Sequence, residues 1–226
     1  MSSFNSRVLA FSQRVQMRRA ETAADRDAIF ALRYRGYLRE GAIAPHISER
    51  FSDPWDEAPT SMIFGLHVDG ELASTMRLHF IGPNGGAIPA LEIFSDALAP
   101  YMAAGKSIMD PTRFVIDDRF AALGPEVPFV MLRLVTMAAQ HYDVDVLLAT
   151  VRTEHVVMYK RLFGHRPITE PRAYPLLAKP IVCMATEMED MRALIRSHHL
   201  FLESTPRERA AVFGESRNFM APSAIV

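Results

Sequence analysis

The chain has 226 residues, 49% of them hydrophobic, and its 25 lysine and arginine residues against 26 aspartate and glutamate residues give a formal charge of -1. This length suffices for one substantial core with terminal extensions, and the balanced charge excludes a general field that would bind nucleic acid or another acidic polymer. The only cysteine, Cys183, excludes a disulfide framework, and no apolar run reaches about 18 residues, so we expect a cytoplasmic protein without a membrane span.

The N-terminal segment has the pattern of a basic amphipathic helix. Arginines occupy its other faces, and four apolar residues recur at helical spacing: Phe4, Val8, Phe11 and Val15. We therefore predict an N-terminal arm over residues 1–16. The arm either packs against its own domain or makes a peripheral contact with a membrane surface or a carrier protein.

A helix and a long loop are predicted next. Thr22 is a suitable N-cap and Gly41 lies beyond the expected end, so the pattern predicts a helix over residues 22–39. Residues 44–59 contain three prolines and no periodicity, which predicts a loop. Loops of this length often carry function.

Strands and helices alternate in the remainder of the chain. The Asp69-Gly70 pair predicts a hairpin between strands over residues 61–66 and 72–80. Further elements are predicted as a strand over 106–116 interrupted at Pro111, a buried helix over 129–142, a buried strand over 144–151, a helix over 155–163, a strand over 180–186 and an amphipathic helix with apolar residues from Met188 to Leu202. This order predicts an α/β fold with a mixed sheet.

The unit formed by residues 146–164 contains a strand, a helix with Tyr159 and a Phe163-Gly164 turn. This unit resembles the second half of the GNAT fold, that of the acyl-CoA N-acyltransferases. The resemblance implies a mixed central sheet flanked by helices, with a tyrosine near the departing thiol. The stretch over residues 119–126 has one glycine, followed by a proline, so it lacks the glycine-rich turn that holds a coenzyme A pyrophosphate in that fold.

Four upstream motifs make the resemblance more specific. Together, over residues 17–186, they resemble acyl-homoserine-lactone synthases and the related long-chain N-acyl amino acid synthases. The motifs are Arg33 with Tyr37, the acidic pair Asp53 and Asp56 around Trp55, Arg77-Leu78, and Asp110-Pro111-Thr112-Arg113-Phe114. Lactone synthases have a tryptophan where this chain has Ile43, which favours an amino acid acceptor over S-adenosylmethionine.

The resemblance implies an acyltransferase domain over residues 17–186, followed by a C-terminal helical extension over 187–226. It implies transfer of a long-chain fatty acyl group from acyl carrier protein, or alternatively from acyl-CoA, to the amine of an amino acid, without a permanently bound cofactor. The residues it implies as catalytic are Asp53, Asp56, Asp110, Arg113 and Tyr159; those implied as substrate-binding are Arg33, Tyr37, Trp55, Arg77 and Phe114.

Elementary chemistry assigns roles to these residues independently. About a tenth of an α-amino group with a pKa near 8 is neutral at pH 7, so a modest base such as Asp53 or Asp56 suffices; otherwise both aspartates stabilise the loop. Arginines on apolar elements should each meet a carboxylate, and Asp110 is the nearest candidate for Arg113. Such a network either braces the loop or binds the carboxylate of the acceptor.

A fatty acyl donor requires an apolar tunnel, because each buried methylene contributes about 0.8 kcal/mol. Large apolar residues that could line a tunnel or belong to the core are Phe129, Met131, Met137 and Met158. A basic cluster over residues 152–166, with Arg152, Lys160, Arg161, His165 and Arg166, could meet the acidic carrier protein or form a solvated helix face.

Three other functions remain open: an acetyl-CoA-dependent N-acetyltransferase, an acyl-homoserine-lactone synthase, and a non-catalytic lipid or carrier-protein binding module. The eight histidines show no spacing typical of metal ligands, so no metal site is predicted. No basic and aromatic stripe suited to nucleic acid is present.

Overall fold

The computed structural model describes residues 3–83, 85–174 and 177–215. Within them, one sheet has the strand order β1-β2-β3-β4-β5-β7-β6. The strands are β1 (Val15–Arg19), β2 (Met62–Val68), β3 (Glu71–Ile81), β4 (Ile108–Ile116), β5 (Val146–Arg152), β6 (Arg166–Pro167) and β7 (Ile181–Glu187). Neighbouring strands are antiparallel except β4 and β5, which are parallel. The predicted mixed sheet is confirmed.

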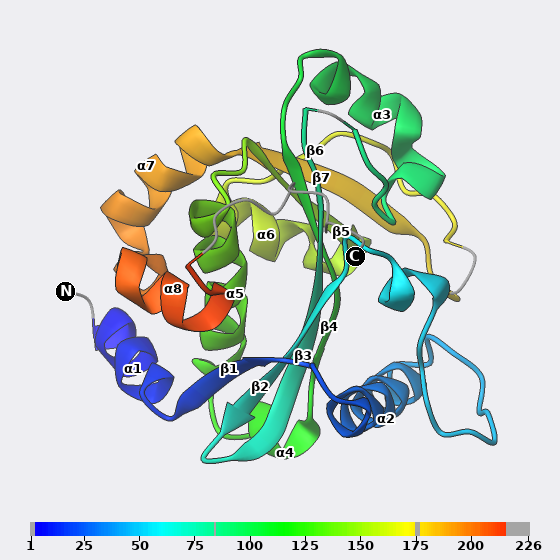
Figure 1. Ribbon diagram of the computed structural model, residues 1–226, viewed down its shortest axis with the longest axis vertical. Helices are drawn as coiled ribbons and strands as arrows, with labels where there is room; N and C mark the ends of the chain where they lie inside the picture. The colour runs from blue at the N-terminus through cyan, green and yellow to red at the C-terminus, as the bar shows by residue number, and fades with distance from the viewer. Residues whose placement is uncertain (1–2, 84, 175–176, 216–226) are drawn as a thin grey trace, which may run out of the picture.

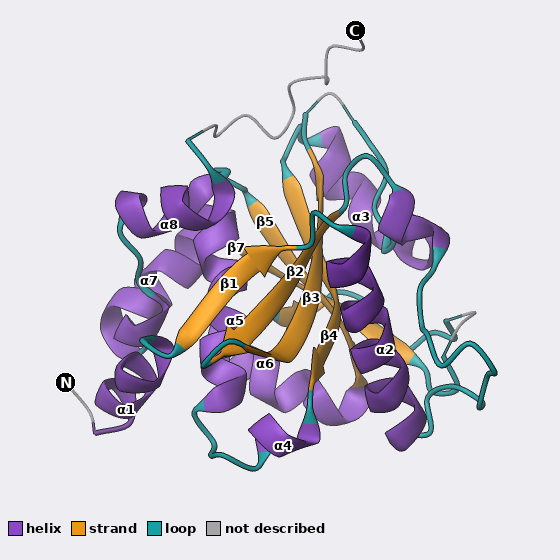
Figure 2. Ribbon diagram, turned by 60° about the horizontal axis from the view of Figure 1, so that its bottom comes forward, coloured by secondary structure: helices purple, strands orange, loops and turns teal. Residues whose placement is uncertain are grey.

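Helices cover both faces of this sheet (Figures 1 and 2). One face carries α2 and α3, and the other carries α5 with α1, α6, α7 and α8 around it (Figure 2). The helices are α1 (Ser3–Ser12), α2 (Ala23–Arg39), α3 (Leu91–Ala103), α4 (Asp118–Ala121), α5 (Val127–His141), α6 (Val156–Phe163), α7 (Met188–His198) and α8 (Pro206–Phe213). The largest apolar cluster fills the space between α5 and strands β2 to β5.

Local signals explain where several elements begin and end. Thr22 and Asp25 form a capping box at the start of α2, in which each side chain accepts a hydrogen bond from the other's backbone N–H. Asp69 and Gly70 have φ angles of 50° and 90° and close the hairpin between β2 and β3, as predicted. Gly164, with a φ of 69°, ends α6 in the left-handed conformation that glycine adopts without strain.

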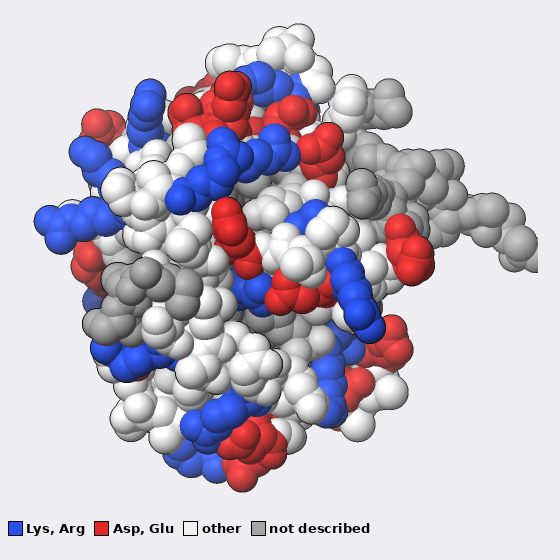
Figure 3. All heavy atoms as spheres, turned by 90° about the vertical axis from the view of Figure 1, so that its left-hand side faces the viewer, with Lys and Arg blue, Asp and Glu red and all other residues white. Residues whose placement is uncertain are grey.

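The apolar face of α1 is buried within the protein. Val8 is 0% exposed, and the Phe4 ring lies 4.9 Å from the Phe129 ring and 5.9 Å from the Phe201 ring, measured between centroids. The face of the molecule that carries α1, α7 and α8 shows acidic and basic side chains interspersed (Figure 3). The arm therefore packs against its own protein, which is the first of the two alternatives that its pattern left open.

Some expected elements are wrong in detail. Val15 belongs to a strand rather than to the N-terminal helix, because the chain turns there and pairs with β2. The C-terminal helix ends at His198, and Leu202 lies in a separate 3-10 turn. Helix α3 follows no pattern identified in the sequence, since it contains Pro100 and a kink at Phe94.

The two parallel strands at the centre of the sheet separate soon after they meet. Their pairing is confined to Ile108 with Val146 and Met109 with Leu147, although each continues beyond to pair with its other neighbour. Pro111 does not interrupt β4, contrary to expectation. A proline lacks an N–H donor, and here β4 has no partner on the β5 side that would require one.

Candidate active site

The loop after α2 presents two buried carboxylates. Asp53 is the N-cap of a 3-10 turn over Pro54–Glu57, and Asp56 lies within that turn. The backbone N–H of Asp53 donates to Asp56 Oδ2 (2.9 Å), and the N–H of Trp55 donates to Asp53 Oδ1 (2.9 Å). Both side chains are 1% exposed. This reciprocal capping fixes the free oxygens of both carboxylates toward the sheet and α2.

Three arginines from three different elements meet these carboxylates. Arg33 of α2 donates to Asp56 Oδ1 (2.7 Å), and Arg77 of β3 donates to Asp53 Oδ1 (2.6 Å). Arg113 of β4 donates to Asp53 Oδ2 through Nε (2.9 Å) and also through Nη2. The prediction that each arginine meets a carboxylate is confirmed.

The backbone of β4 has a bulge that brings Arg113 to this network. The register between β3 and β4 shifts between Thr75 and Arg77, and Arg113 adopts a φ of 55°. Thr112 accepts a hydrogen bond from Arg77 Nε (3.0 Å). The consecutive residues Thr112 and Arg113 of β4 therefore both contact the network of arginines and aspartates. A regular strand would turn the Arg113 side chain to the opposite face from Thr112.

Asp110 is not the partner of Arg113, contrary to expectation. Its Oδ2 accepts from the backbone N–H of Ala90 (2.9 Å), at the start of α3. Its Oδ1 has no hydrogen-bond partner among the described residues, and the side chain is fully buried. Burial outweighs the Ala90 hydrogen bond and raises the pKa of Asp110 to about 7.

The network has more positive than negative charge. Three guanidinium groups face two carboxylates, and Arg33 Nε, Arg33 Nη2 and Arg77 Nη2 are buried donors without a partner among the described residues. Burial acts to raise the pKa of Asp53, but hydrogen bonds and charges from Arg77 and Arg113 lower it to about 2. A carboxylate held so firmly in its ionised form is a weak base.

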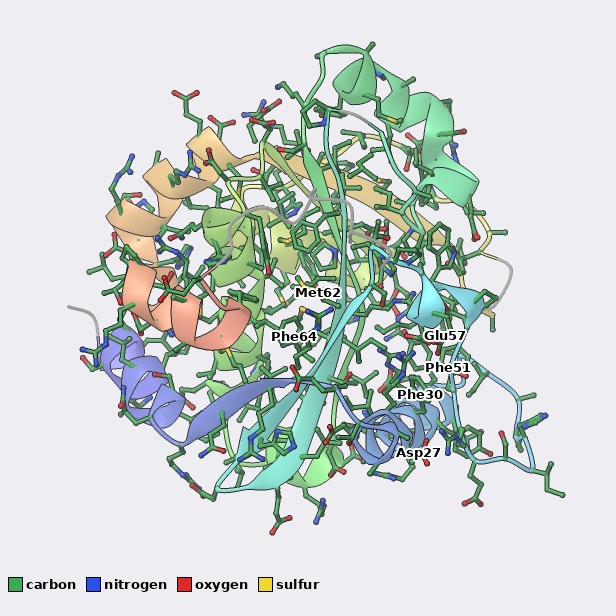
Figure 4. The ribbon with its side chains drawn as sticks, in the orientation of Figure 1. Asp27, Phe30, Phe51, Glu57, Met62 and Phe64 are labelled. Carbon is green, nitrogen blue, oxygen red and sulfur yellow. The ribbon has the colours of Figure 1, made fainter. Side chains whose placement is uncertain are left out.

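Aromatic rings cover the outer side of Arg113. Its guanidinium carbon lies 4.9 Å from the Phe51 ring centroid and 5.6 Å from that of Tyr37, and these two rings stack at 4.7 Å. The Tyr37 hydroxyl accepts a hydrogen bond from Arg113 Nη1 (3.4 Å). Phe51 and Phe30 lie between α2 and the loop that follows it (Figure 4). Arg113 is thus clamped on three sides.

A cavity of about 460 Å³ lies where β4 and β5 separate. Four of the predicted site residues line it: Tyr37, Arg113, Phe114 and Tyr159. Six do not, because Asp53, Asp56, Arg33 and Arg77 lie behind Arg113, while Trp55 and Asp110 lie toward α3; these six are absent from the cavity wall.

The cavity wall is apolar inside and charged at one rim. Met158 lines it, whereas Phe129, Met131 and Met137, expected as tunnel candidates, are absent from the wall and belong to the core. Besides Arg113, the wall includes Arg39, Glu40, Arg152, His155 and Lys179. Arg152 donates to Glu40 (3.2 Å) and approaches His155 Nε2 (3.2 Å).

Tyr159 projects from α6 to this cavity. Burial raises the pKa of its hydroxyl to about 12, and the hydroxyl has no hydrogen-bond partner among the described residues. His165 lies beside it, with ring centroids 5.8 Å apart. Sequence reasoning placed His165 in an exposed basic cluster, which is wrong: Gly164 turns the chain inward and His165 is 1% exposed.

Trp55 lies apart from the cavity and braces the loop. Its indole Nε1 donates to Glu92 Oε1 of α3 (2.7 Å), and its ring meets the His79 ring edge to face at 5.6 Å. The described residues contain no cluster of three or more histidine, cysteine, aspartate or glutamate side chains able to hold a metal ion. Within the described residues, no helix has the length and apolar character needed to cross a membrane.

Comparisons with known proteins agree with this fold. The solved structure of FeeM, an N-acyl amino acid synthase from uncultured soil microbes, matches with a TM-score of 0.66 at 22% identity, covering 80% of this chain and 94% of that one. The acyl-homoserine-lactone synthase LasI matches at 0.56 and 16% identity, covering 77% and 89%. TofI, solved in a ternary complex with an inhibitor and MTA, matches at 0.57 and 14% identity, covering 86% and 98%.

These structural likenesses confirm the predicted GNAT-like fold. A search of curated protein sequences finds no match. A family model described as N-acyl amino acid synthase FeeM matches residues 28–187, which include all four upstream motifs, the cavity and Tyr159. The chain therefore belongs to the FeeM family of N-acyl amino acid synthases, and it is an acyltransferase.

Proposed function

We propose that this protein transfers a long-chain fatty acyl group from acyl carrier protein to the α-amine of an amino acid. The cavity between β4 and β5 is the observation that carries the proposal. Its volume of about 460 Å³ falls within the range of roughly 300–1,000 Å³ typical of ligand pockets. Its apolar wall suits an acyl chain, since each buried methylene contributes about 0.8 kcal/mol.

The positive network supports an acceptor with a carboxylate. Arg113 reaches the cavity wall while Asp53 holds its other edge. Because the network carries one positive charge more than its carboxylates neutralise, an anionic group at the wall gains a favourable interaction. The α-carboxylate of an amino acid supplies such a group, and Tyr37 stands beside the same guanidinium.

The proposed reaction is direct attack of the neutral amine on the thioester carbonyl. A carbon–nitrogen bond forms, the tetrahedral intermediate collapses, and the carbon–sulfur bond breaks. A backbone N–H where β4 and β5 separate stabilises the oxyanion, because these strands have no ladder partners on their facing sides there. The amine proton passes to solvent, and the departing thiolate receives a proton.

Tyr159 is the proposed proton donor for that thiolate. Tyr159 lines the cavity, and its hydroxyl has no hydrogen-bond partner in the described part of the chain. Asp53 and Asp56 are assigned to holding the three arginines rather than to accepting the amine proton, because the pKa of Asp53 is lowered to about 2. Asp110 is assigned to fixing the start of α3 through Ala90.

The charged rim suits the entry of a carrier's phosphopantetheine arm. Arg39, Arg152 and Lys179 line it, with Glu40 as the acidic member of the lining. The chain lacks the glycine-rich turn expected for a coenzyme A pyrophosphate, which supports acyl carrier protein over acyl-CoA as donor. Because the apolar face of α1 is already buried, the proposal includes no membrane contact.

Product analysis tests the proposal. The protein is mixed with long-chain acyl carrier protein and all twenty amino acids, and products are identified by mass spectrometry while thiol release is followed. An N-acyl amino acid is the expected product. Release of methylthioadenosine from S-adenosylmethionine would instead identify a lactone synthase, consumption of acetyl-CoA with an amine an N-acetyltransferase, and binding of the carrier without turnover a binding module.

Substitution of the arginines tests the site. Arg113→Ala and Arg77→Ala are expected to abolish product formation. The first removes the proposed partner of the acceptor's carboxylate, and the second removes the arginine that shares Asp53 with Arg113. Arg14→Ala, which removes an exposed partner of Asp69, is the control and should retain activity. Thermal unfolding of each variant separates loss of the site from loss of the fold. Full activity in both network variants would rule out this site.

A further inference from the structure

His165 is a buried imidazole that lines the cavity. Only 1% of the residue is exposed, and neither ring nitrogen has a hydrogen-bond partner among the described residues. The backbone of Leu147 and Leu148 lies near the ring and partly offsets the effect of burial on the pKa of His165. A buried polar group without a partner is unfavourable and uncommon, so its presence at this wall points to a partner inside the cavity.

The protonation state of His165 limits what that partner can be. Burial lowers its pKa to about 4, so the ring is neutral near pH 7. A neutral imidazole offers one N–H donor and one acceptor nitrogen. Such a group has no charge with which to hold a phosphate or a carboxylate, but it pairs well with a neutral oxygen.

The surroundings of His165 place that oxygen. The Tyr159 and Phe163 rings meet it edge to face, at 5.8 and 5.7 Å between centroids, and Leu148 and Met158 line the same cavity. The imidazole is therefore an isolated polar group among apolar side chains. A ligand atom bonded to His165 also lies close to Tyr159.

We infer that His165 selects acyl chains that carry a hydroxyl or oxo oxygen close to the thioester over unsubstituted chains. The inference rests on the proposed function, which places the thioester sulfur beside Tyr159. A hydroxyl pairs with either ring nitrogen and an oxo group pairs with the N–H, whereas a methylene leaves both nitrogens unpaired. Sites built to hydrogen-bond an oxygen reject the analogue that lacks it.

Competition between donors tests this inference. The same carrier protein is loaded with dodecanoyl, β-hydroxydodecanoyl or β-oxododecanoyl chains, and equal mixtures are converted under initial-rate conditions with product ratios read by mass spectrometry. We expect the wild type to prefer one oxygenated chain by roughly 5- to 150-fold, the range for leaving one buried polar group unpaired. The two oxygenated arms identify which oxygen is recognised.

Three variants isolate the imidazole. His165→Phe keeps a ring against Tyr159 and Phe163 and should bring the preference close to unity, whereas His165→Asn keeps a donor and an acceptor and should retain part of it. Met158→Leu changes the same wall without a polar atom and should leave the ratio unchanged. Binding of the three free fatty acids, measured by calorimetry, gives the same comparison without turnover and also serves if His165→Phe fails to fold.

The outcomes separate this inference from the proposed function. Equal use of all three chains by the wild type, or a preference that survives in His165→Phe, overturns the role of His165. Absence of product from every chain contradicts the proposed function instead. In that case the calorimetric comparison still decides whether His165 recognises an oxygen on the chain.

Discussion

Replacing Asp53 by asparagine is expected to destabilise the fold by about 3 kcal/mol, because this one carboxylate pairs with two buried arginines. Asparagine has nearly the same shape and can still accept from the Trp55 N–H, so the change removes charge with little change in volume. Arg77 and Arg113 would then remain buried at 0% and 5% side-chain exposure. Among the described residues, Arg77 would keep its ion pair with Asp56 (3.0 Å), whereas Arg113 would keep none.

Two lines of reasoning give that magnitude. The pKa of Asp53 falls from 3.8 to about 2, and each pKa unit corresponds to about 1.36 kcal/mol, so the charged form contributes on the order of 2–3 kcal/mol. Breaking a buried ion pair by removing one partner typically costs about 3–5 kcal/mol. Because the folded-state pKa is lowered, this stability is present above pH 3.8 and is lost as the pH falls through 2.

Urea unfolding at pH 7 and in steps down to pH 2 measures this effect. The difference between wild type and Asp53→Asn should be largest at pH 7 and should close between pH 4 and pH 2. Asp69→Asn is the matched control, since Asp69 pairs with Arg14 at the surface and asparagine tolerates its φ of 50°. A loss in Asp53→Asn no larger than that of the control would refute the argument that the network is a buried ion cluster.

Three further substitutions follow from the same structure. Asp110→Asn should gain about 2–3 kcal/mol relative to wild type between pH 5 and pH 8 in urea unfolding, because the pKa of Asp110 is raised to about 7 and its stabilising protonated form is lost as the pH rises; a constant difference would contradict this. Gly36→Ala places a Cβ 2.4 Å from Val115 Cγ1 and should cost about 1–3 kcal/mol in thermal unfolding, with partial recovery when Val115→Ala is added; no recovery would mean that the contact is not the cause. His165→Phe should raise the melting temperature, because it removes two unpaired buried nitrogens; a lower value would show that they are paired within the folded protein.

Elements with strong local signals were predictable from the sequence. The capping box at Thr22, the Asp69-Gly70 turn and the Gly164 terminus each depend on residues within a few positions of one another. Helix α3 was not predictable in the same way, because Pro100 and the kink at Phe94 break its periodicity and its stability comes from packing on β5 and β7. An element boundary is therefore predictable where residues close in sequence make the hydrogen bonds or the turn that form it.

The arginine network was predictable in kind but not in its partners. Arginines on apolar elements require carboxylates wherever they lie, and this requirement is visible in the sequence. The nearest candidate, Asp110, was wrong, because Ala90 at the start of α3 takes its carboxylate while a bulge turns Arg113 toward Asp53, 60 residues earlier in the chain. His165 was likewise assigned to the surface, since nothing in its neighbours indicates the inward turn that follows α6.

The sequence by itself determined the class of fold, the order of most elements and the family, because apolar periodicity, caps, turns and motif residues are local properties of the chain. Tertiary structure alone decided which aspartate pairs with which arginine, where β4 and β5 separate, and that Tyr159 and His165 share one cavity. These features depend on the register of strands that are distant in sequence and on the desolvation of charges between them. Neither quantity is a property of any short segment.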